Sequence, residues 1–261
     1  MRVLFLMLIL LICAAPAFAF GTGAEGCSGD CTACHKVTLN EVREIFKNID
    51  PGVVVEDVSP APARSLYQVT LKKDGQVHVA YLDFSKNYLL AGQLFDIRNK
   101  RDLTRERMEE TATINPSEIP LENALIAGNP KGSKVLYIFS DPECPYCSTL
   151  HDTVRELIRE EPELKVYIML IPLDIHPDAL WKTESIVCAS RSDQKAALAM
   201  LERSYEKKEV PRSECAGGVG VEMKKLGVKL GIGVTPTLAF ASGKMLAGAR
   251  GKDEIRKLLG N

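Results

Sequence analysis

The sequence predicts a small α+β domain followed by a larger α/β domain. In the first half, one helical pattern precedes three short extended runs, an order typical of an antiparallel sheet. In the second half, an apolar strand, an amphipathic helix and another apolar strand follow one another, which predicts a parallel βαβ unit. The charged stretch 104–113 lies between the halves and is compatible with a solvated linker helix.

The first domain begins with a helix. Thr38 and Glu41 have the spacing of a capping box, so we expect a helix from there to about Asn48, ended by Asp50-Pro51-Gly52. The extended runs that follow are 53–55, 66–72 and 77–83. Asp74-Gly75 stands between the last two runs and predicts a hairpin turn. These elements make a small sheet with one helix.

The second domain contains the predicted βαβ unit. Its strands are 134–139 and 164–171, and its helix runs from about 148 to 160. Five apolar side chains are predicted to share one face of this helix: Tyr146, Leu150, Val154, Leu157 and Ile158. The later elements are helices at 177–190, 193–205 and 219–230, strands at 237–241 and 245–249, and a closing helix at 252–259. This order is that of a thioredoxin-like domain with a helical insertion.

The first residues predict export. Arg2 precedes an apolar run, Val3 to Ile12, and Ala17-Phe18-Ala19 has the small-x-small form of a signal-peptidase site. Cys13 raises the alternative of a lipoprotein, but bulky Ile12 fits poorly with the small residue preferred before a lipidated cysteine. No later stretch reaches the ~18 to 20 apolar residues that cross a bilayer, so we expect a mature chain that is exported and soluble.

Charge and cysteine count limit the possible functions. The chain has 33 Lys and Arg against 34 Asp and Glu, which gives no net attraction to nucleic acid or to an acidic membrane. Without Cys13, seven of the eight cysteines remain in the mature chain. An odd number in an exported protein leaves at least one thiol free, intermolecular or bound to a cofactor.

Cys144-Pro145-Tyr146-Cys147 lies between a predicted strand and a predicted helix. A cysteine at a helix N-terminus is favoured as a thiolate by the backbone N–H groups and the helix dipole. We therefore predict a redox pair in which Cys144 is the nucleophile, with a lowered pKa. Glu143 should oppose the thiolate, and His151 is interpreted as a solvated or capping side chain rather than a catalytic base.

Thr235-Pro236 stands just before the predicted final hairpin. In a thioredoxin-like topology this loop returns beside the cysteine pair, so we read the bond as a cis peptide rather than an ordinary strand-edge proline. The backbone of Thr235 would then help to hold an extended substrate beside Cys144. Thr235, Pro236 and Tyr146 are the predicted substrate-binding residues.

A second cysteine cluster lies in the Gly-rich segment 20–37. Cys31-Thr-Ala-Cys34-His35 has the form of a c-type haem attachment site, whereas a plain disulfide or second redox pair is the simpler alternative. With Cys27, the same residues also have the spacing of an iron–sulfur motif or of a strained zinc site. Cys27 could instead bridge two subunits. No metal site and no required cofactor are predicted.

Several stretches resemble the periplasmic disulfide isomerase family of DsbC and DsbG. They are Val58-Ser-Pro-Ala-Pro62, Gly92-Gln-Leu-Phe-Asp-Ile97, Phe139-Ser-Asp-Pro-Glu-Cys-Pro-Tyr-Cys147 and Gly233-Val-Thr-Pro236. The resemblance covers nearly all of the mature sequence. Together with the residue patterns above, it predicts a signal peptide (1–19), a Cys-rich segment (20–37), a cystatin-like α+β dimerisation domain (38–100), a linker helix (101–120) and a thioredoxin-like catalytic domain (121–261).

The resemblance also implies a function. Members are V-shaped periplasmic homodimers whose active pair is kept reduced by a membrane-bound donor and whose apolar cleft receives misoxidised proteins. By motif match, Cys144 attacks, Cys147 resolves and Pro236 is the cis-proline. Cys188 and Cys215 would form the family's structural disulfide, although two buried free thiols are the alternative.

The leading hypothesis is therefore an exported disulfide isomerase or reductase. A haem-bearing electron-transfer protein using Cys31, Cys34 and His35 is an alternative of a different class. A net thiol oxidase and a thiol-independent chaperone are further alternatives, because Pro-Tyr between the cysteines, found in DsbG in place of the Gly-Tyr of DsbC, does not fix the redox poise.

Overall fold

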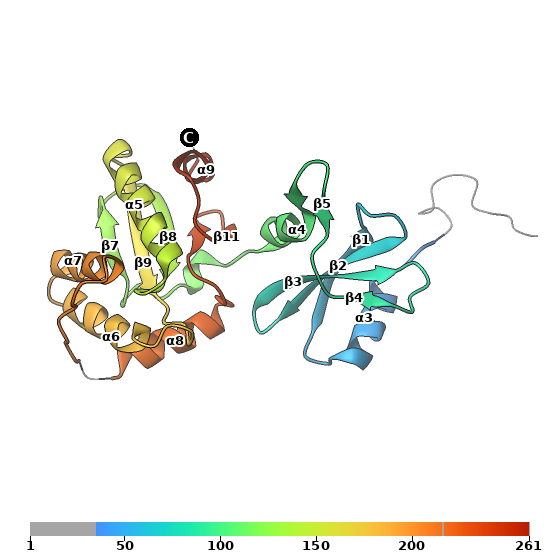
Figure 1. Ribbon diagram of the computed structural model, residues 1–261, viewed down its shortest axis with the longest axis horizontal. Coiled ribbons are helices and arrows are strands. Elements are labelled where there is room, and N and C mark those ends of the chain that lie inside the picture. Colours follow the sequence, from blue (N-terminus) through green and yellow to red (C-terminus); the bar gives the residue numbers. More distant parts are fainter. Residues whose placement is uncertain (1–34, 216, 261) are drawn as a thin grey trace, which may run out of the picture. The chain divides into compact units, whose positions relative to one another are not determined.

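The computed structural model describes residues 35–215 and 217–260 (Figure 1). The predicted signal peptide and Cys27, Cys31 and Cys34 lie outside the described residues. In the described part of the chain, no helix is both long and apolar enough to span a membrane.

The first domain begins with α3 (Leu39–Ile49), and the predicted capping box is present. The backbone N–H of Glu41 donates to Thr38 Oγ1 at 3.2 Å, and the Thr38 N–H donates to Glu41 Oε2 at 2.8 Å. These bonds satisfy N–H groups that the first helical turn leaves unpaired. Val42 and Phe46, one turn apart, are buried in the core that α3 forms with the sheet.

The sheet of this domain is antiparallel, in the order β1-β2-β3-β4. Its strands are β1 (Val54–Pro60), β2 (Leu66–Lys73), β3 (Gln76–Asp83) and β4 (Leu89–Leu90). The turn between β2 and β3 is the predicted one, with positive φ at Asp74 (49°) and Gly75 (79°), which Asp and Gly tolerate. The short pair β5 (Phe95–Asp96) and β6 (Arg101–Asp102) follows, then α4 (Leu103–Thr111) and a 3-10 turn, η1 (Pro116–Glu118).

The second domain contains a five-stranded sheet in the order β11-β10-β8-β9-β7. The strands are β7 (Leu125–Gly128), β8 (Lys134–Ser140), β9 (Leu164–Leu170), β10 (Thr237–Phe240) and β11 (Met245–Ala247). Among the described strands of this sheet only β8 and β9 are parallel, from Lys134 opposite Leu164 to Ser140 opposite Leu170. The predicted βαβ unit and final hairpin are therefore both present. Strand β7, a short strand at the edge of this sheet, was not predicted.

Five helices belong to this domain: α5 (Pro145–Glu160), α6 (Ala179–Ser190), α7 (Gln194–Tyr205), α8 (Val219–Lys229) and α9 (Lys252–Leu258). The helical insertion is α6 to α8, with α6 packed against both α7 and α8 (Figure 1). Leu150, Val154 and Leu157 of α5 are buried in the core, as predicted. The prediction that Tyr146 shares that buried face is wrong, because Tyr146 lies in the first turn of α5 and is 69% exposed.

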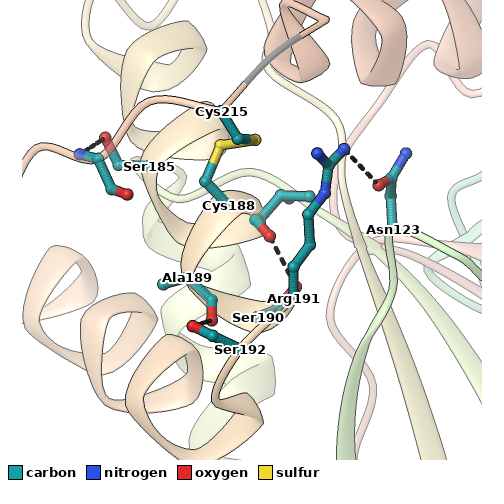
Figure 2. Close-up of a disulfide and its surroundings, with 10 residues drawn as sticks. Asn123, Ser185, Cys188, Ala189, Ser190, Arg191, Ser192 and Cys215 are labelled. Atoms are coloured by element: carbon teal, nitrogen blue, oxygen red, sulfur yellow. Dashed lines mark hydrogen bonds between the residues drawn. A yellow bond between two sulfur atoms is a disulfide. The ribbon is translucent and has the colours of Figure 1, made fainter.

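A disulfide joins Cys188 of α6 to Cys215 in the segment before α8, the pairing that the family resemblance implied (Figure 2). Their Cα atoms lie 5.6 Å apart, across a sequence separation of 27 residues. Ser185, one turn before Cys188, accepts a hydrogen bond from the backbone of Ser213 at 3.1 Å. Two links thus hold the segment after α7 against α6.

Candidate active site

The strand-to-helix junction between β8 and α5 places the cysteine pair. Cys144 is the N-cap of α5, and Pro145 occupies the first helical turn, where the missing N–H of proline costs no hydrogen bond. The backbone N–H groups of Cys147 and Ser148 donate to the Cys144 carbonyl at 3.1 and 3.2 Å. Cys144 therefore sits at the positive end of a helix of 16 residues.

The two thiols have different environments. A hydrogen bond from the Cys147 thiol, followed by one from the Cys147 backbone N–H, lowers the pKa of Cys144 to about 6. Burial has the opposite effect on Cys147, which is 1% exposed, and raises its pKa well above the ordinary value for a thiol. The structure thus stabilises one thiolate and keeps its neighbour protonated.

The loop before β10 lies against Cys144. The Thr235–Pro236 peptide bond is cis, and Cys144 Sγ lies 3.5 Å from the carbonyl oxygen of Thr235. Pro236 is buried, whereas Val234 is 54% exposed. Tyr146 lies two residues after Cys144 and Val234 directly precedes Thr235, so each exposed apolar side chain belongs to one of the two segments that meet at the Cys144 sulfur. The predicted substrate-binding residues are therefore close to the predicted nucleophile.

A buried carboxylate that the sequence pattern did not predict, Asp141, holds the loop that leads to Cys144. Asp141 is fully buried and accepts hydrogen bonds from the N–H groups of Glu143 and Leu173, both at 2.8 Å. Nδ1 of His176 lies 3.0 Å from Asp141 Oδ2. The Asp141 N–H itself points to Cys147 Sγ at 3.4 Å. The only sequence signal for this role is the position of Asp141 at the end of β8, three residues before the nucleophile.

Glu143 was expected to oppose the thiolate of Cys144. In the structure its side chain accepts hydrogen bonds from Lys182 Nζ at 2.9 Å and from the Asp178 N–H at 2.8 Å. Both groups belong to the start of α6. The positive charge of Lys182 offsets the negative charge of Glu143, so the expected opposition is weakened.

The interpretation of His151 as a solvated or capping side chain is wrong. The His151 side chain is only 10% exposed, and burial lowers its pKa. Its ring lies 5.3 Å, centroid to centroid, from the ring of Tyr205, and its Nε2 lies 3.5 Å from Glu202 Oε1. The insertion helix α7 supplies both neighbours, and periodicity along α5 could not show that α7 covers this position.

Cys31 and Cys34 lie outside the described residues, so the haem, disulfide, iron–sulfur and zinc hypotheses stay predictions. His35 is exposed at the start of the described residues. Within residues 35–215 and 217–260, no group of three or more His, Cys, Asp or Glu side chains is arranged to hold a metal ion.

The fold and the site together define a class of enzyme. In a thioredoxin-fold thiol–disulfide oxidoreductase, two cysteines lie at the N-terminus of the helix that follows a central parallel strand, and a cis-proline loop lies opposite them. This protein has that arrangement. Family models agree: residues 121–261 match a thioredoxin-like domain, and residues 31–105 match the N-terminal domain of disulfide bond isomerases.

Individual proteins are also similar in sequence to this chain. The chain is 31% identical over 218 residues to a probable thiol:disulfide interchange protein DsbC of Bordetella pertussis, covering 84% of this chain and 73% of the relative. It is 21% identical to the DsbC of Escherichia coli, over 80% of this chain and 82% of that protein. A DsbG of Pseudomonas aeruginosa is 26% identical, over 69% and 73%. The chain belongs to the DsbC family of thiol:disulfide interchange proteins.

Solved structures are also similar in part, among them the following. A disulfide interchange protein from Neisseria gonorrhoeae is 27% identical and superposes with a TM-score of 0.45, covering 55% of this chain and 100% of that one.

Proposed function

We propose that this protein is an exported disulfide isomerase that corrects wrong disulfides in other exported proteins. The observation that carries the proposal is the contrast between the two thiols. A pKa of about 6 leaves Cys144 mostly ionised at neutral pH, whereas Cys147 stays protonated. A thiolate beside a protonated partner suits attack on a disulfide followed by delayed resolution.

The proposed reaction begins when the Cys144 thiolate attacks one sulfur of a substrate disulfide. The Cys144–substrate bond forms as the substrate's own S–S bond breaks, and the other substrate sulfur leaves as a thiolate. If that or another substrate thiol then attacks the mixed disulfide, the substrate is isomerised and Cys144 is regenerated. If Cys147 attacks Cys144 instead, the substrate is reduced and the Cys144–Cys147 disulfide forms. Neither route needs a cofactor.

Substrate recognition is proposed to use the cis-proline loop. An extended chain could lie along the backbone of Thr235, with its disulfide at Cys144 and its apolar side chains against Tyr146 and Val234. The exposure of these two apolar side chains, 69% and 54%, supports a role in contact with unfolded chains.

A homodimer joined through the N-terminal domains is part of the proposal. The match to the N-terminal domain of disulfide bond isomerases supports it. Exposed apolar side chains near edge strand β4 support it as well, since an exposed sheet edge with apolar residues favours pairing with another chain. They are Tyr88, Leu89, Leu90, Phe95 and Ile97, which are between 38% and 86% exposed.

We also propose a periplasmic location and a membrane-bound reducing donor. The signal-like segment 1–19 and the DsbC relatives support the location. An isomerase in an oxidising compartment needs its pair reduced, so a donor must return two electrons to Cys144 and Cys147 after each reductive turnover.

The test is reactivation of scrambled ribonuclease by the reduced protein. Wild type should restore ribonuclease activity, and Cys144→Ser should abolish this. Cys147→Ala is the matched variant: it should retain isomerisation but lose the reductive route, because the mixed disulfide can then be resolved only by substrate thiols. Failure of the reduced wild type to reactivate ribonuclease would overturn the proposal.

A further inference from the structure

A small cavity lies beneath the cysteine pair, between α5, α7 and the sheet. Its volume is about 10 Å³, close to the minimum that one water molecule requires. Four of its lining residues carry polar groups: Ser140, Cys147, His151 and Tyr205. The others are apolar, namely Ile138, Leu150, Val154 and Ile168. Polar groups from β8, α5 and α7 thus converge on one small cavity beside the resolving thiol.

The polar groups form a connected series. The Ser140 hydroxyl interacts with the Cys147 sulfur on one side and is 2.6 Å from the Tyr205 hydroxyl on the other. Tyr205 packs against the His151 ring, and His151 Nε2 faces Glu202, which is partly exposed at the surface of α7. The Glu202 carboxylate can only accept a hydrogen bond, so Nε2 of neutral His151 carries the N–H that faces it. Nδ1 is then the ring nitrogen with a lone pair that can accept a proton.

We infer that His151 is the proton acceptor for Cys147 during resolution, acting through Tyr205 and Ser140 and one water in this cavity. This assignment rests on the proposed function, because it concerns the step in which Cys147 attacks. Cys147 must lose its proton to become a nucleophile, yet burial opposes the thiolate. Burial keeps the Cys147 thiol protonated and inert while the substrate is isomerised, and the relay accepts its proton in the step in which Cys147 attacks.

The step balances as follows. The Cys147 S–H bond breaks and its proton moves along the relay to neutral His151, which becomes an imidazolium facing the Glu202 carboxylate. The Cys147 thiolate attacks Cys144 of the mixed disulfide and the Cys144–Cys147 bond forms. The bond between Cys144 and the substrate breaks, and the substrate sulfur leaves with the electron pair as a thiolate. The proton then reaches solvent past Glu202.

The charges around His151 suit an acceptor that is neutral at rest. Burial, the largest effect, lowers its pKa, whereas Glu202 of α7 raises it; on α5 itself, Arg155 lowers it and Asp152 raises it. The groups facing it from the sheet and from α7, Ser140 and Tyr205, carry no charge at neutral pH. A neutral imidazole can accept a proton and a protonated one cannot, so resolution must slow as the pH falls through the lowered pKa of His151, at a pH below the ordinary histidine value of 6.5.

The test separates attack by Cys144 from resolution by Cys147. Reduced protein is mixed in stopped flow with dithiobis(nitrobenzoate), in enough excess that the first release of thionitrobenzoate, by Cys144, is complete before the second, by Cys147. His151→Gln should slow the second release roughly 100-fold at neutral pH and leave the first within about twofold. The deficit should shrink as the pH rises, because hydroxide then removes the Cys147 proton.

Two further variants complete the experiment. Tyr205→Phe keeps the ring but removes the hydroxyl that bonds Ser140, so it should slow the second release as well; it carries the test if His151→Gln does not fold. His78→Gln changes an exposed side chain on β3 of the first domain; it is the matched control and should leave both releases unchanged. The relay alone would be overturned if a folded His151→Gln or Tyr205→Phe variant had the same second-release rate and the same pH profile as wild type. Absence of a second release in wild type would overturn the proposed resolving role of Cys147 itself.

Discussion

The ionisation of Cys144 gives the most direct test of the site electrostatics. The hydrogen bond from Cys147 is the largest effect that lowers the Cys144 pKa to about 6. We therefore consider Cys147→Ala, which removes the thiol donor and leaves the helix N-terminus in place. A hydrogen bond to a charged group contributes about 1.5 to 3 kcal/mol, so its loss should raise the Cys144 pKa by about 1 to 2.

The expected loss of Cys144 thiolate is large at neutral pH. With a pKa of about 6, roughly nine-tenths of Cys144 is thiolate at pH 7. In Cys147→Ala the fraction should fall to about a quarter, if the pKa rises by about 1.5. Because the pKa of Cys144 is lowered, its thiolate and its reactivity are present above that pKa and are lost below it. In wild type the loss occurs as the pH falls through about 6, and in the variant it occurs at a higher pH.

Two measurements check this prediction: thiolate absorbance in the ultraviolet against pH, and the rate of alkylation by iodoacetamide over the same range. Ser148→Ala, the same kind of truncation one residue further along α5, is the control and should titrate like wild type. An unchanged midpoint in Cys147→Ala would refute the reasoning, since the helix terminus and the backbone would then account for the whole effect.

Three further predictions concern stability and binding. Replacing Cys188 and Cys215 with Ala should lower the free energy of unfolding by about 3.5 kcal/mol, because the disulfide closes a loop across a separation of 27 residues and so restricts the unfolded chain. Urea titration followed by the fluorescence of Trp181, the single tryptophan, measures this loss. Leu150→Ala should lower it by about 2 to 5 kcal/mol in the same assay, because Leu150 is 1% exposed; a loss below 1 kcal/mol would contradict its place in the core. Tyr146→Ser should leave the free energy of unfolding within about 0.5 kcal/mol of wild type, since the side chain is 69% exposed. In a Cys144→Ser/Cys147→Ser background, the same substitution should weaken the binding of an unfolded peptide. Equal binding would show that Tyr146 is not part of the substrate-binding surface.

Local signals in the sequence were sufficient to predict most of the helices and strands. The Thr38–Glu41 capping box, the Asp74-Gly75 turn and the apolar runs on either side of α5 act over a few residues, so the chain itself reveals them. The fold class predicted from their order is confirmed. Strand β7 was missed because four residues carry too little periodicity to be recognised without the neighbouring strand β9.

The sequence by itself determined that two cysteines stand at the start of a helix and that a Thr-Pro pair precedes the final hairpin. Only the tertiary structure decided which charges and hydrogen bonds surround them. Lys182 neutralises Glu143 from 39 residues away, Asp141 fixes the loop through a contact with the segment after β9, and α7 buries His151 beside Cys147. The reason is physical: a pKa depends on burial and on charges a few ångströms away in space, and the residues that supply them here are brought together by packing rather than by proximity in the chain.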